Sequence, residues 1–308
     1  MPLLENQIIH GDNLDVLRTL PDQAFQLIYI DPPFNTGKRQ ARKTLATEAS
    51  ENGDRVGFGG LRYATRLLAE SSYRDEFADY LSFLEPRLIE ARRVLDKTGT
   101  LYFHIDYREA HYCKLLLDEL FGRENFLNEI VWAYDYGARS KKRWPAKHDT
   151  ILVYVKDVSQ YYFNSEEVDR EPYMAPGLVT AEKREKGKLP TDVWWHTIVP
   201  TNGREKTGYP TQKPEGIVRR MVLASTQPGD WCLDFFAGSG TLGAVAAKTG
   251  RRFILIDESD EAVKVAQERL ATAHVRDGKN HFVSLMACWT VIASSSIRPP
   301  KASAGISQ

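Results

Sequence analysis

The 308 residues include 41 Lys and Arg and 41 Asp and Glu, so the formal net charge is zero and binding to a polyanion would depend on local basic clusters. With 42% hydrophobic and 27% charged residues, the composition is typical of a soluble globular protein with a sizeable core. Cys113, Cys232 and Cys288 lie far apart, which argues against a disulfide framework or a structural zinc site. The first residues do not resemble a signal peptide and no apolar stretch is long enough to cross a bilayer, so we expect a cytoplasmic protein without a membrane partner.

Apolar runs typical of strands alternate with helical patterns, which predicts a parallel sheet with crossover helices. In the first part of the chain we expect strands at 6–12 and 27–30, with a short helix at 13–20 between them. The second strand delivers Asp31 at its carboxyl end, where two prolines and a phenylalanine follow. No period is visible over 35–72, and we expect a long mobile loop there.

Two helical patterns follow at 75–84 and 86–95, and Pro86 fits best in the first turn of the second. A strand at 99–106 comes next. A helix at 109–122, closed by a glycine, completes this half of the predicted domain.

The pattern changes after residue 130. Strand-like runs at 129–137, 150–157 and 192–199 are separated by polar, charged loops and resemble antiparallel strands. We therefore expect residues 131–210 to form an inserted recognition region.

The alternation of strand and helix resumes in the last third of the chain. The expected elements are a helix at 215–226, a strand at 231–236, a helix at 241–250, a strand at 252–257 and a helix at 260–273. Residues 281–293 are expected to add one more strand, and residues 294–308, rich in Ser, Ala and Pro, a disordered tail.

A glycine-rich turn lies between two of these late strands. The first strand leads into Gly238, Ser239 and Gly240, and the next one ends in Asp257. Glycines let the backbone approach a ligand closely, the helix start presents free N–H groups, and an acid at the next strand end can accept both hydroxyls of a ribose. The pattern indicates an adenosine-containing cofactor. With Gly243 the turn also matches G-x-G-x-x-G, so this stretch alone leaves NAD open.

The sequence DPPF at 31–34, TQKP at 211–214 and FAGSGT at 236–241 together resemble the β-class amino-methyltransferases of DNA. Further fragments follow the family order, namely GDNLDVLRTLPD, GTLYFHID, VWAYDYG, KHDTILVYVKD and FILIDES. The resemblance covers about residues 5–270. It implies S-adenosylmethionine rather than NAD as cofactor and double-stranded DNA as substrate. Most members belong to bacterial restriction–modification or orphan methylation systems, so a partner restriction endonuclease and a homodimer are expected by analogy.

In this class the catalytic motif precedes the cofactor loop, as in a circular permutation of a Rossmann-like methyltransferase fold. The resemblance therefore implies an α/β, doubly wound, mostly parallel sheet in which the strand at 6–12 lies beside the strand at 252–257. Residues 1–130 would form the catalytic half of the domain and residues 211–293 the cofactor-binding half.

The resemblance also assigns a role to the prolines. The Asp31 side chain and the Pro32 carbonyl would accept the two hydrogens of an exocyclic amino group, and the locked φ angles of Pro32 and Pro33 would hold both acceptors rigidly. Phe34 would stack on the base, which must leave the duplex. An aspartate at this place resembles the adenine-N6 members, whereas cytosine-N4 enzymes more often have serine. We therefore expect a DNA adenine-N6 methyltransferase.

The remaining site residues are carried over by resemblance. Asp257 would hold the ribose, Phe236 would border the adenine ring and Asp234 would lie near the methionine amino group. Asp12 would meet the adenine ring, although a helix N-cap explains it equally well. The other expected cofactor residues are Ala237, Gly238, Ser239, Gly240 and Thr241 in the turn, and Thr211, Gln212 and Lys213 at the methionine end, where Lys213 could instead be a solvated charge.

Two basic clusters are candidates for contacts with DNA phosphates. They are Lys38, Arg39, Arg42 and Lys43 after the catalytic motif, and Arg139, Lys141, Lys142 and Arg143, with Trp144, in the middle region. Either cluster could equally be a solvated surface.

Three alternatives stay open. The chain could methylate cytosine N4 or an RNA base, or it could be a catalytically silent DNA-binding module of the same fold. His104 closes a strand at the same edge, but a structural histidine is at least as good an explanation, because the methylated amine can lose its proton to water.

Overall fold

The computed structural model describes residues 3, 5–35, 38–49, 55–56, 62–75, 79–137, 139–272, 274–276, 282–284 and 289–296, and in the segments 38–75 and 274–289 only the backbone. The chain divides into two compact units, residues 33–80 and the remainder. No helix in these described ranges combines the length and apolar character needed to cross a bilayer.

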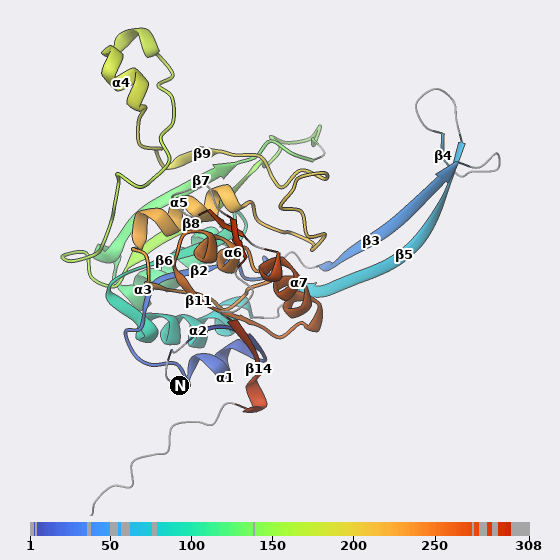
Figure 1. Ribbon diagram of the computed structural model, residues 1–308, viewed down its shortest axis with the longest axis horizontal. Coiled ribbons are helices and arrows are strands. Elements are labelled where there is room, and N and C mark those ends of the chain that lie inside the picture. The colour runs from blue at the N-terminus through green and yellow to red at the C-terminus, as the bar shows by residue number, and fades with distance from the viewer. Residues whose placement is uncertain are drawn as a thin grey trace, which may run out of the picture. The chain divides into compact units, whose positions relative to one another are not determined.

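A nine-stranded sheet organises the larger unit (Figure 1). In spatial order its strands are β14 (Trp289–Ala293), β1 (Asn6–His10), β11 (Arg252–Asp257), β10 (Trp231–Asp234), β2 (Phe25–Ile30), β6 (Leu95–Asp106), β8 (His148–Val155), β7 (Phe126–Ala133) and β9 (Val193–Trp195). The first six are parallel, β8 is antiparallel to both its neighbours, and β9 is parallel to β7. Because β1 pairs with β11, the order expected for a circularly permuted domain is confirmed.

Helices cover both faces of this sheet, as expected for a doubly wound fold. They are α1 (Asn13–Leu17), α2 (Tyr80–Val94), α3 (Ala110–Phe121), α5 (Glu215–Ser225), α6 (Thr241–Lys248) and α7 (Asp260–Ala271). Figure 1 shows α5 and α6 on the opposite side of the sheet from α1 and α2. Met221 and Leu242 from these helices pack in one buried cluster with Leu27 and Leu255 of the strands. Full burial of each such side chain contributes about 1.5–3 kcal/mol, so this layer helps to hold α5 and α6 against the sheet.

The region around Pro86 differs from the expectation. One helix, α2, runs through it instead of two, with Pro86 in its interior. A proline there removes a backbone hydrogen bond and costs about 3 kcal/mol. Leu84, Leu88 and Ala91 are completely buried, and this tertiary packing outweighs the local penalty.

The smaller unit also differs from its prediction. It contains the antiparallel strands β3 (Lys38–Ala49) and β5 (Arg62–Asp75). The short strand β4 (Arg55–Val56) pairs with the other edge of β5. The expectation of a loop without regular structure over 35–72 is therefore wrong for these strands. The run KRQARKTLATEA has no alternation of apolar and polar residues, so its sequence gave no strand signal.

The middle region is only partly an insertion. β8 pairs with β6, and β7 pairs with β8, so both strands belong to the central sheet rather than to a separate region spanning 131–210. β9 runs parallel to β7, which corrects the expectation of an antiparallel strand. The connections 134–147 and 156–192, the latter with the short helix α4 (Ala181–Lys186), lie outside these strands, and a recognition role for them stays a prediction.

At the carboxyl-terminal end, β14 adds the expected further strand beside β1. A short 3₁₀ helix occupies Ser294–Ser296 of the predicted disordered tail. Residues 297–308 of that tail lie outside the described residues.

Candidate active site

Three neighbouring parallel strands each end in, or directly before, an aspartate. Asp31 follows β2, Asp234 ends β10 and Asp257 ends β11, with β10 between the other two strands. Burial raises the pKa of Asp234 well above its ordinary value, and the nearby charge of Asp31 adds to this. The two motifs some two hundred positions apart in sequence therefore meet at one edge of the sheet.

Asp31 is held by Lys213. The lysine Nζ donates a hydrogen bond to Asp31 Oδ2, and the two side chains are only 9% and 18% exposed. This burial excludes a solvated charge for Lys213. The other carboxylate oxygen, Oδ1, is buried and accepts no hydrogen bond from any residue that the structure describes. Asp31 thus presents one fixed acceptor, oriented by a cation on its other oxygen.

The glycine turn after β10 requires its glycines. Gly238 and Gly240 have φ angles of 47° and 70°, which L side chains rarely adopt. A Cβ at Gly240 would also lie 2.9 Å from the Cβ of Ala266, and one at Gly238 would lie 3.2 Å from the ring of Tyr209. Gly240 is the N-cap of α6. The turn therefore requires glycine both for its backbone conformation and for its close packing against Ala266 and Tyr209.

Asp257 and Asp234 stabilise this turn through the backbone. Asp257 Oδ2 accepts a hydrogen bond from Gly238 N at 2.8 Å, and Asp234 Oδ1 accepts one from Phe236 N at 3.0 Å. Burial also raises the pKa of Asp257, although its backbone hydrogen bonds oppose the shift. The fully buried Asp234, whose pKa is raised, favours a ligand that brings positive charge.

Asp12 follows β1 and serves as a helix cap. Its Oδ1 accepts hydrogen bonds from Leu14 N at 2.8 Å and Asp15 N at 3.1 Å, so the N-cap interpretation is confirmed. Arg87 of α2 donates to its Oδ2 at 3.2 Å.

A second set of contacts connects α1 to the turn after β10. Arg87 Nε donates to Asn13 Oδ1 at 2.6 Å, and Asn13 Nδ2 donates to Phe235 O at 2.7 Å. Arg87 also lies over the ring of Phe83, which is 6.1 Å from the ring of Phe236. The sequence did not indicate Arg87 or Asn13, because each lies in an ordinary helical pattern.

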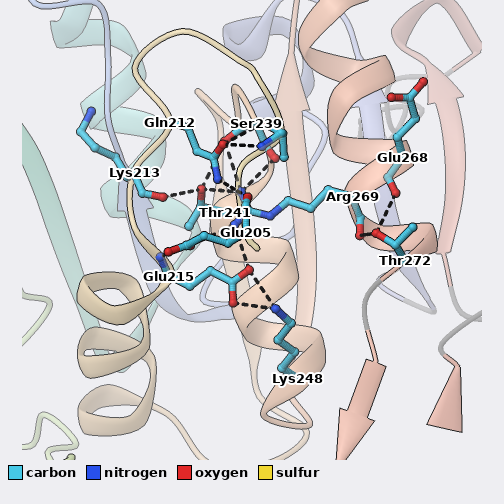
Figure 2. A network of polar contacts seen from close by, with 11 residues as sticks. Glu205, Gln212, Lys213, Glu215, Ser239, Thr241, Lys248, Glu268, Arg269 and Thr272 are labelled. Carbon is cyan, nitrogen blue, oxygen red and sulfur yellow. Dashed lines mark hydrogen bonds and ion pairs between the residues drawn. The ribbon is translucent and has the colours of Figure 1, made fainter. Parts of the chain in front are cut away.

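A buried arginine connects the cofactor turn to the TQKP segment (Figure 2). Arg269 of α7 donates through Nη1 to Thr241 Oγ1 at 2.9 Å and to Ser239 O and Oγ at 3.3 Å. Its Nη2 donates to Glu215 Oε1 at 2.9 Å. Thr241 Oγ1 in turn donates to Lys213 O at 3.2 Å. Sequence reasoning missed Arg269 because a single arginine in an amphipathic helix carries no distinguishing signal.

The side chains of the TQKP segment are used differently from one another. Gln212 accepts hydrogen bonds from Thr207 N and Oγ1, both at 2.9 Å, and donates to Glu205 O at 2.6 Å. Its amide therefore stabilises the loop 205–212 rather than facing the strand ends. Thr211 is exposed and has a φ angle of 58°. Of the three residues, Lys213 is the one whose side chain reaches the strand-end carboxylates.

The basic cluster of the middle region lies on the connection between β7 and β8. Because Asp106 pairs with Asp149, and Ala133 with His148, this connection leaves the sheet at the same edge as Asp31. Trp144 is 95% exposed. The four basic residues of this cluster, Arg139, Lys141, Lys142 and Arg143, are exposed too. Arg139 pairs with Asp135, and Arg143 donates a hydrogen bond to the hydroxyl of Tyr107. The side chains of the other cluster, including Lys38 and Arg39, lie outside the described residues.

His104 is a core residue. Its Nδ1 lies 3.0 Å from the hydroxyl of Tyr29 and its Nε2 lies 3.2 Å from Asp149 Oδ2, and the side chain is completely buried. The structural explanation given for it from the sequence is confirmed.

Comparisons with known proteins agree with this geometry. The model of the N6/N4 DNA methylase family matches residues 25–268. DNA adenine methyltransferase YhdJ of Escherichia coli is 34% identical over 274 residues, which cover 86% of this chain and 83% of that protein. Type II methyltransferase M.HpaI of Haemophilus parainfluenzae is 29% identical, covering 87% and 74%. Among solved structures, the cytosine-N4-specific PvuII DNA methyltransferase has the same fold, with a TM-score of 0.59 at 15% identity and 86% of each chain covered.

The expected doubly wound methyltransferase fold is thereby confirmed, as is the family inferred from the motifs. The matched residues include Asp31, the TQKP segment and the glycine turn, which are the parts that meet at the sheet edge. The chain belongs to the N6/N4 DNA methylase family and is an S-adenosylmethionine-dependent DNA amino-methyltransferase.

Proposed function

We propose that this enzyme transfers the methyl group to the exocyclic N6 of an adenine that has left the stack of double-stranded DNA. The observation that carries the proposal is that Asp31, held by Lys213, ends the strand next to the one that leads into the glycine turn. An aspartate at the head of the DPPF motif resembles the adenine-N6 members of the family. The relative YhdJ, named a DNA adenine methyltransferase, supports the same base.

The residues at the sheet edge fit S-adenosylmethionine. When bound, this cofactor supplies a methyl group activated by the positive charge of its sulfonium. Asp257 would hold the ribose hydroxyls, Phe236 would border the adenine ring, and Asp234 would face the methionine ammonium. The raised pKa of the buried Asp234 supports its assignment, since a bound ammonium would offset the burial that disfavours its charge. The left-handed backbone at Gly238 and Gly240 supports close approach of the turn to the ligand.

The catalytic step is assigned to the DPPF motif. The amino nitrogen of a base is a poor nucleophile because its lone pair is delocalised into the ring. Acceptors directed at its two hydrogens favour the tetrahedral form that attacks, and they act mainly in the transition state. Asp31 Oδ1 and the carbonyl of Pro32 would be these acceptors, while Lys213 fixes Oδ2.

The second half of the motif has a structural support of its own. The hydroxyl of Tyr80 donates to the carbonyl of Pro33 at 2.6 Å, which restrains the chain just before Phe34. Phe34 would stack on the displaced base. The proton of the methylated amine would leave to water, so no side chain is needed as a strong base.

DNA would be bound by the connection between β7 and β8. Lys141 and Lys142 are exposed and carry no ion pair among the described residues, so they are the best placed phosphate ligands. The fully exposed ring of Trp144 could stack on an unpaired base. Lys38 and Arg39 are proposed to add contacts after the catalytic motif. A homodimer and a partner restriction endonuclease stay predictions by analogy.

Methyl transfer from labelled S-adenosylmethionine to duplex DNA, followed by nucleoside analysis, tests the proposal. We expect label in N6-methyladenine. Label in N4-methylcytosine alone would refute the base assignment, and transfer to RNA in preference to duplex DNA would refute the substrate. Cofactor binding without transfer to any nucleic acid would indicate a silent DNA-binding module.

A further inference from the structure

A buried carboxylate outside the DPPF motif borders the candidate active site. It belongs to Asp149 of β8, and the register of the strands places it near the catalytic motif. The pairing of β2 with β6 continues to the residues just before Asp31 and His104, so these two lie side by side. Asp106, two residues after His104, pairs with Asp149. Because residues two apart in a strand share one face of the sheet, Asp31, His104 and Asp149 lie on the same face.

Neighbouring side chains hold both oxygens of Asp149. Oδ2 lies 3.2 Å from His104 Nε2, and Oδ1 accepts a hydrogen bond from the hydroxyl of Tyr134 at 3.2 Å. His104 is fixed in turn by Tyr29, whose hydroxyl lies 3.0 Å from Nδ1. These contacts set the position of the carboxylate, but they do not require its charge. An asparagine could accept from Tyr134 through Oδ1 and donate to His104 through Nδ2.

The negative charge of Asp149 has a partner in Lys213. Burial acts to raise the pKa of Asp149, but the hydrogen bond to His104 and the positive charge of Lys213 outweigh it, so that the pKa is lowered and the group is ionised at neutral pH. Lys213 is buried too, and its Nζ donates to Asp31 Oδ2. The charge of Lys213 also reaches Asp234, but burial raises the pKa of that carboxyl well above its ordinary value. Asp149 is therefore an ionised carboxylate that accompanies Asp31 near the ammonium.

This second carboxylate matters because of the chemistry of lysine. Removing an ammonium from water is costly, and each ionised carboxylate near it offsets part of the cost. The lysine stem is long and flexible, so the ammonium stays at Asp31 only where the surrounding charges favour that position. We infer that Asp149 is a positioning residue for methyl transfer, whose negative charge holds Lys213 in the place from which the lysine orients Asp31. This inference rests on the catalytic role proposed for Asp31.

Asp149→Asn tests the inference, because it removes the charge while it preserves the shape and can keep both hydrogen bonds. Single-turnover methyl transfer from labelled S-adenosylmethionine to duplex DNA is measured on the full chain. We expect transfer to slow about tenfold, since small displacements of a catalytic group have large effects on rate, while cofactor affinity stays near that of wild type. Asp118→Asn is a matched control, because Asp118 also accepts from a tyrosine hydroxyl and pairs with a lysine, but on α3. It should transfer at the wild-type rate.

A double-mutant cycle separates positioning from a purely structural role. Lys213→Met removes the ammonium and keeps the apolar stem. In that background Asp149→Asn should slow transfer by less than about twofold, because the charge has no lysine left to hold. A structural role would produce the same loss in both backgrounds. If Lys213→Met does not fold, the same comparison in the Asp31→Asn background decides, since Asp149 acts on the reaction through Asp31.

Three results would overturn the inference. They are a loss of less than about threefold in Asp149→Asn, equal losses in the two backgrounds, and failure of Asp149→Asn to fold, which would show that the carboxylate has a structural role. A wild-type rate in Asp31→Asn alone would instead overturn the proposed function, so the two failures are distinguishable.

Discussion

Arg269→Met is the substitution that most directly tests how the cofactor turn is supported. The arginine side chain is 6% exposed and links the turn at Ser239 and Thr241 to Glu215 (Figure 2). Methionine retains the apolar stem and removes every hydrogen bond. Glu215 then keeps Lys248 as a partner, whereas Ser239 O loses a donor.

The magnitude follows from the burial of the arginine. Removing one partner of a buried ion pair costs about 3–5 kcal/mol when the remaining charge has no other partner, so this range is an upper bound for Arg269→Met, after which Glu215 keeps Lys248. Lys248→Met provides a matched control, since Lys248 pairs with the same carboxylate but is 38% exposed. We expect it to lower the free energy of unfolding by less than about 1 kcal/mol. Arg269→Lys should recover only part of the loss, because an ammonium cannot reproduce the planar fork.

Equilibrium urea unfolding of the wild type and the three variants measures these differences, and calorimetric titration with S-adenosylmethionine measures the affinity of the turn for the cofactor. We expect Arg269→Met to weaken both and Lys248→Met to change neither by much. A loss of unfolding free energy below about 1 kcal/mol in Arg269→Met, together with unchanged cofactor affinity, would refute the role given to this network.

The same network predicts a dependence on pH. Burial acts to raise the pKa of Glu215, but Lys248 and Arg269 outweigh it, so that the pKa is lowered in the folded protein. Stability from this group is therefore present above the pKa of an unfolded glutamate, about 4.3, and is lost as the pH falls through the lower folded value. Arg269→Met should reduce this acid-dependent loss.

Three further predictions concern other parts of the chain. Asp234→Asn can keep the hydrogen bond from Phe236 N and removes a carboxyl group whose pKa is raised by burial. We therefore expect the cofactor-free protein to gain at least about 1 kcal/mol of unfolding free energy at pH 7, while its affinity for S-adenosylmethionine falls. A stability lower than that of the wild type would contradict this. Thr100→Val should leave the free energy of thermal unfolding within about 0.5 kcal/mol of wild type or raise it, since the buried hydroxyl has no partner among the described residues, whereas a clear loss would show that it has a structural role. Replacing Lys141 and Lys142 by alanine should weaken DNA binding and reduce the slope of log affinity against log salt by roughly 2, with Lys264→Ala on the surface of α7 as the control that leaves the slope unchanged.

The central part of the fold could be predicted because its signals are local. Apolar runs ending in Asp31, Asp234 and Asp257 mark three strands, and parallel strands bring their carboxyl ends to one edge. The order of the motifs then placed β1 beside β11. Each of these features depends on a short stretch in which the side-chain pattern and the backbone preference indicate the same element.

What the sequence did not predict depends on long-range contacts. The apolar runs of β7 and β8 fit an inserted region as well as the central sheet, and only the pairing of β8 with β6 and of β7 with β8 decides between the two. Arg269 and Arg87 became recognisable only when folding brought their partners to them. Pro86 misled because local propensity is overridden by the buried face of α2.

The rate of methyl transfer by Asp31→Asn, measured under single-turnover conditions with labelled S-adenosylmethionine and duplex DNA, tests the central claim most directly. Asparagine preserves the shape of the side chain but abolishes the carboxylate that Lys213 orients, so we expect transfer to slow by at least about 10²–10³-fold while cofactor affinity stays near that of wild type. As a control, the Asp22→Asn variant, which changes an exposed aspartate, should transfer the methyl group at the wild-type rate. Transfer by Asp31→Asn within a few-fold of wild type would contradict the account.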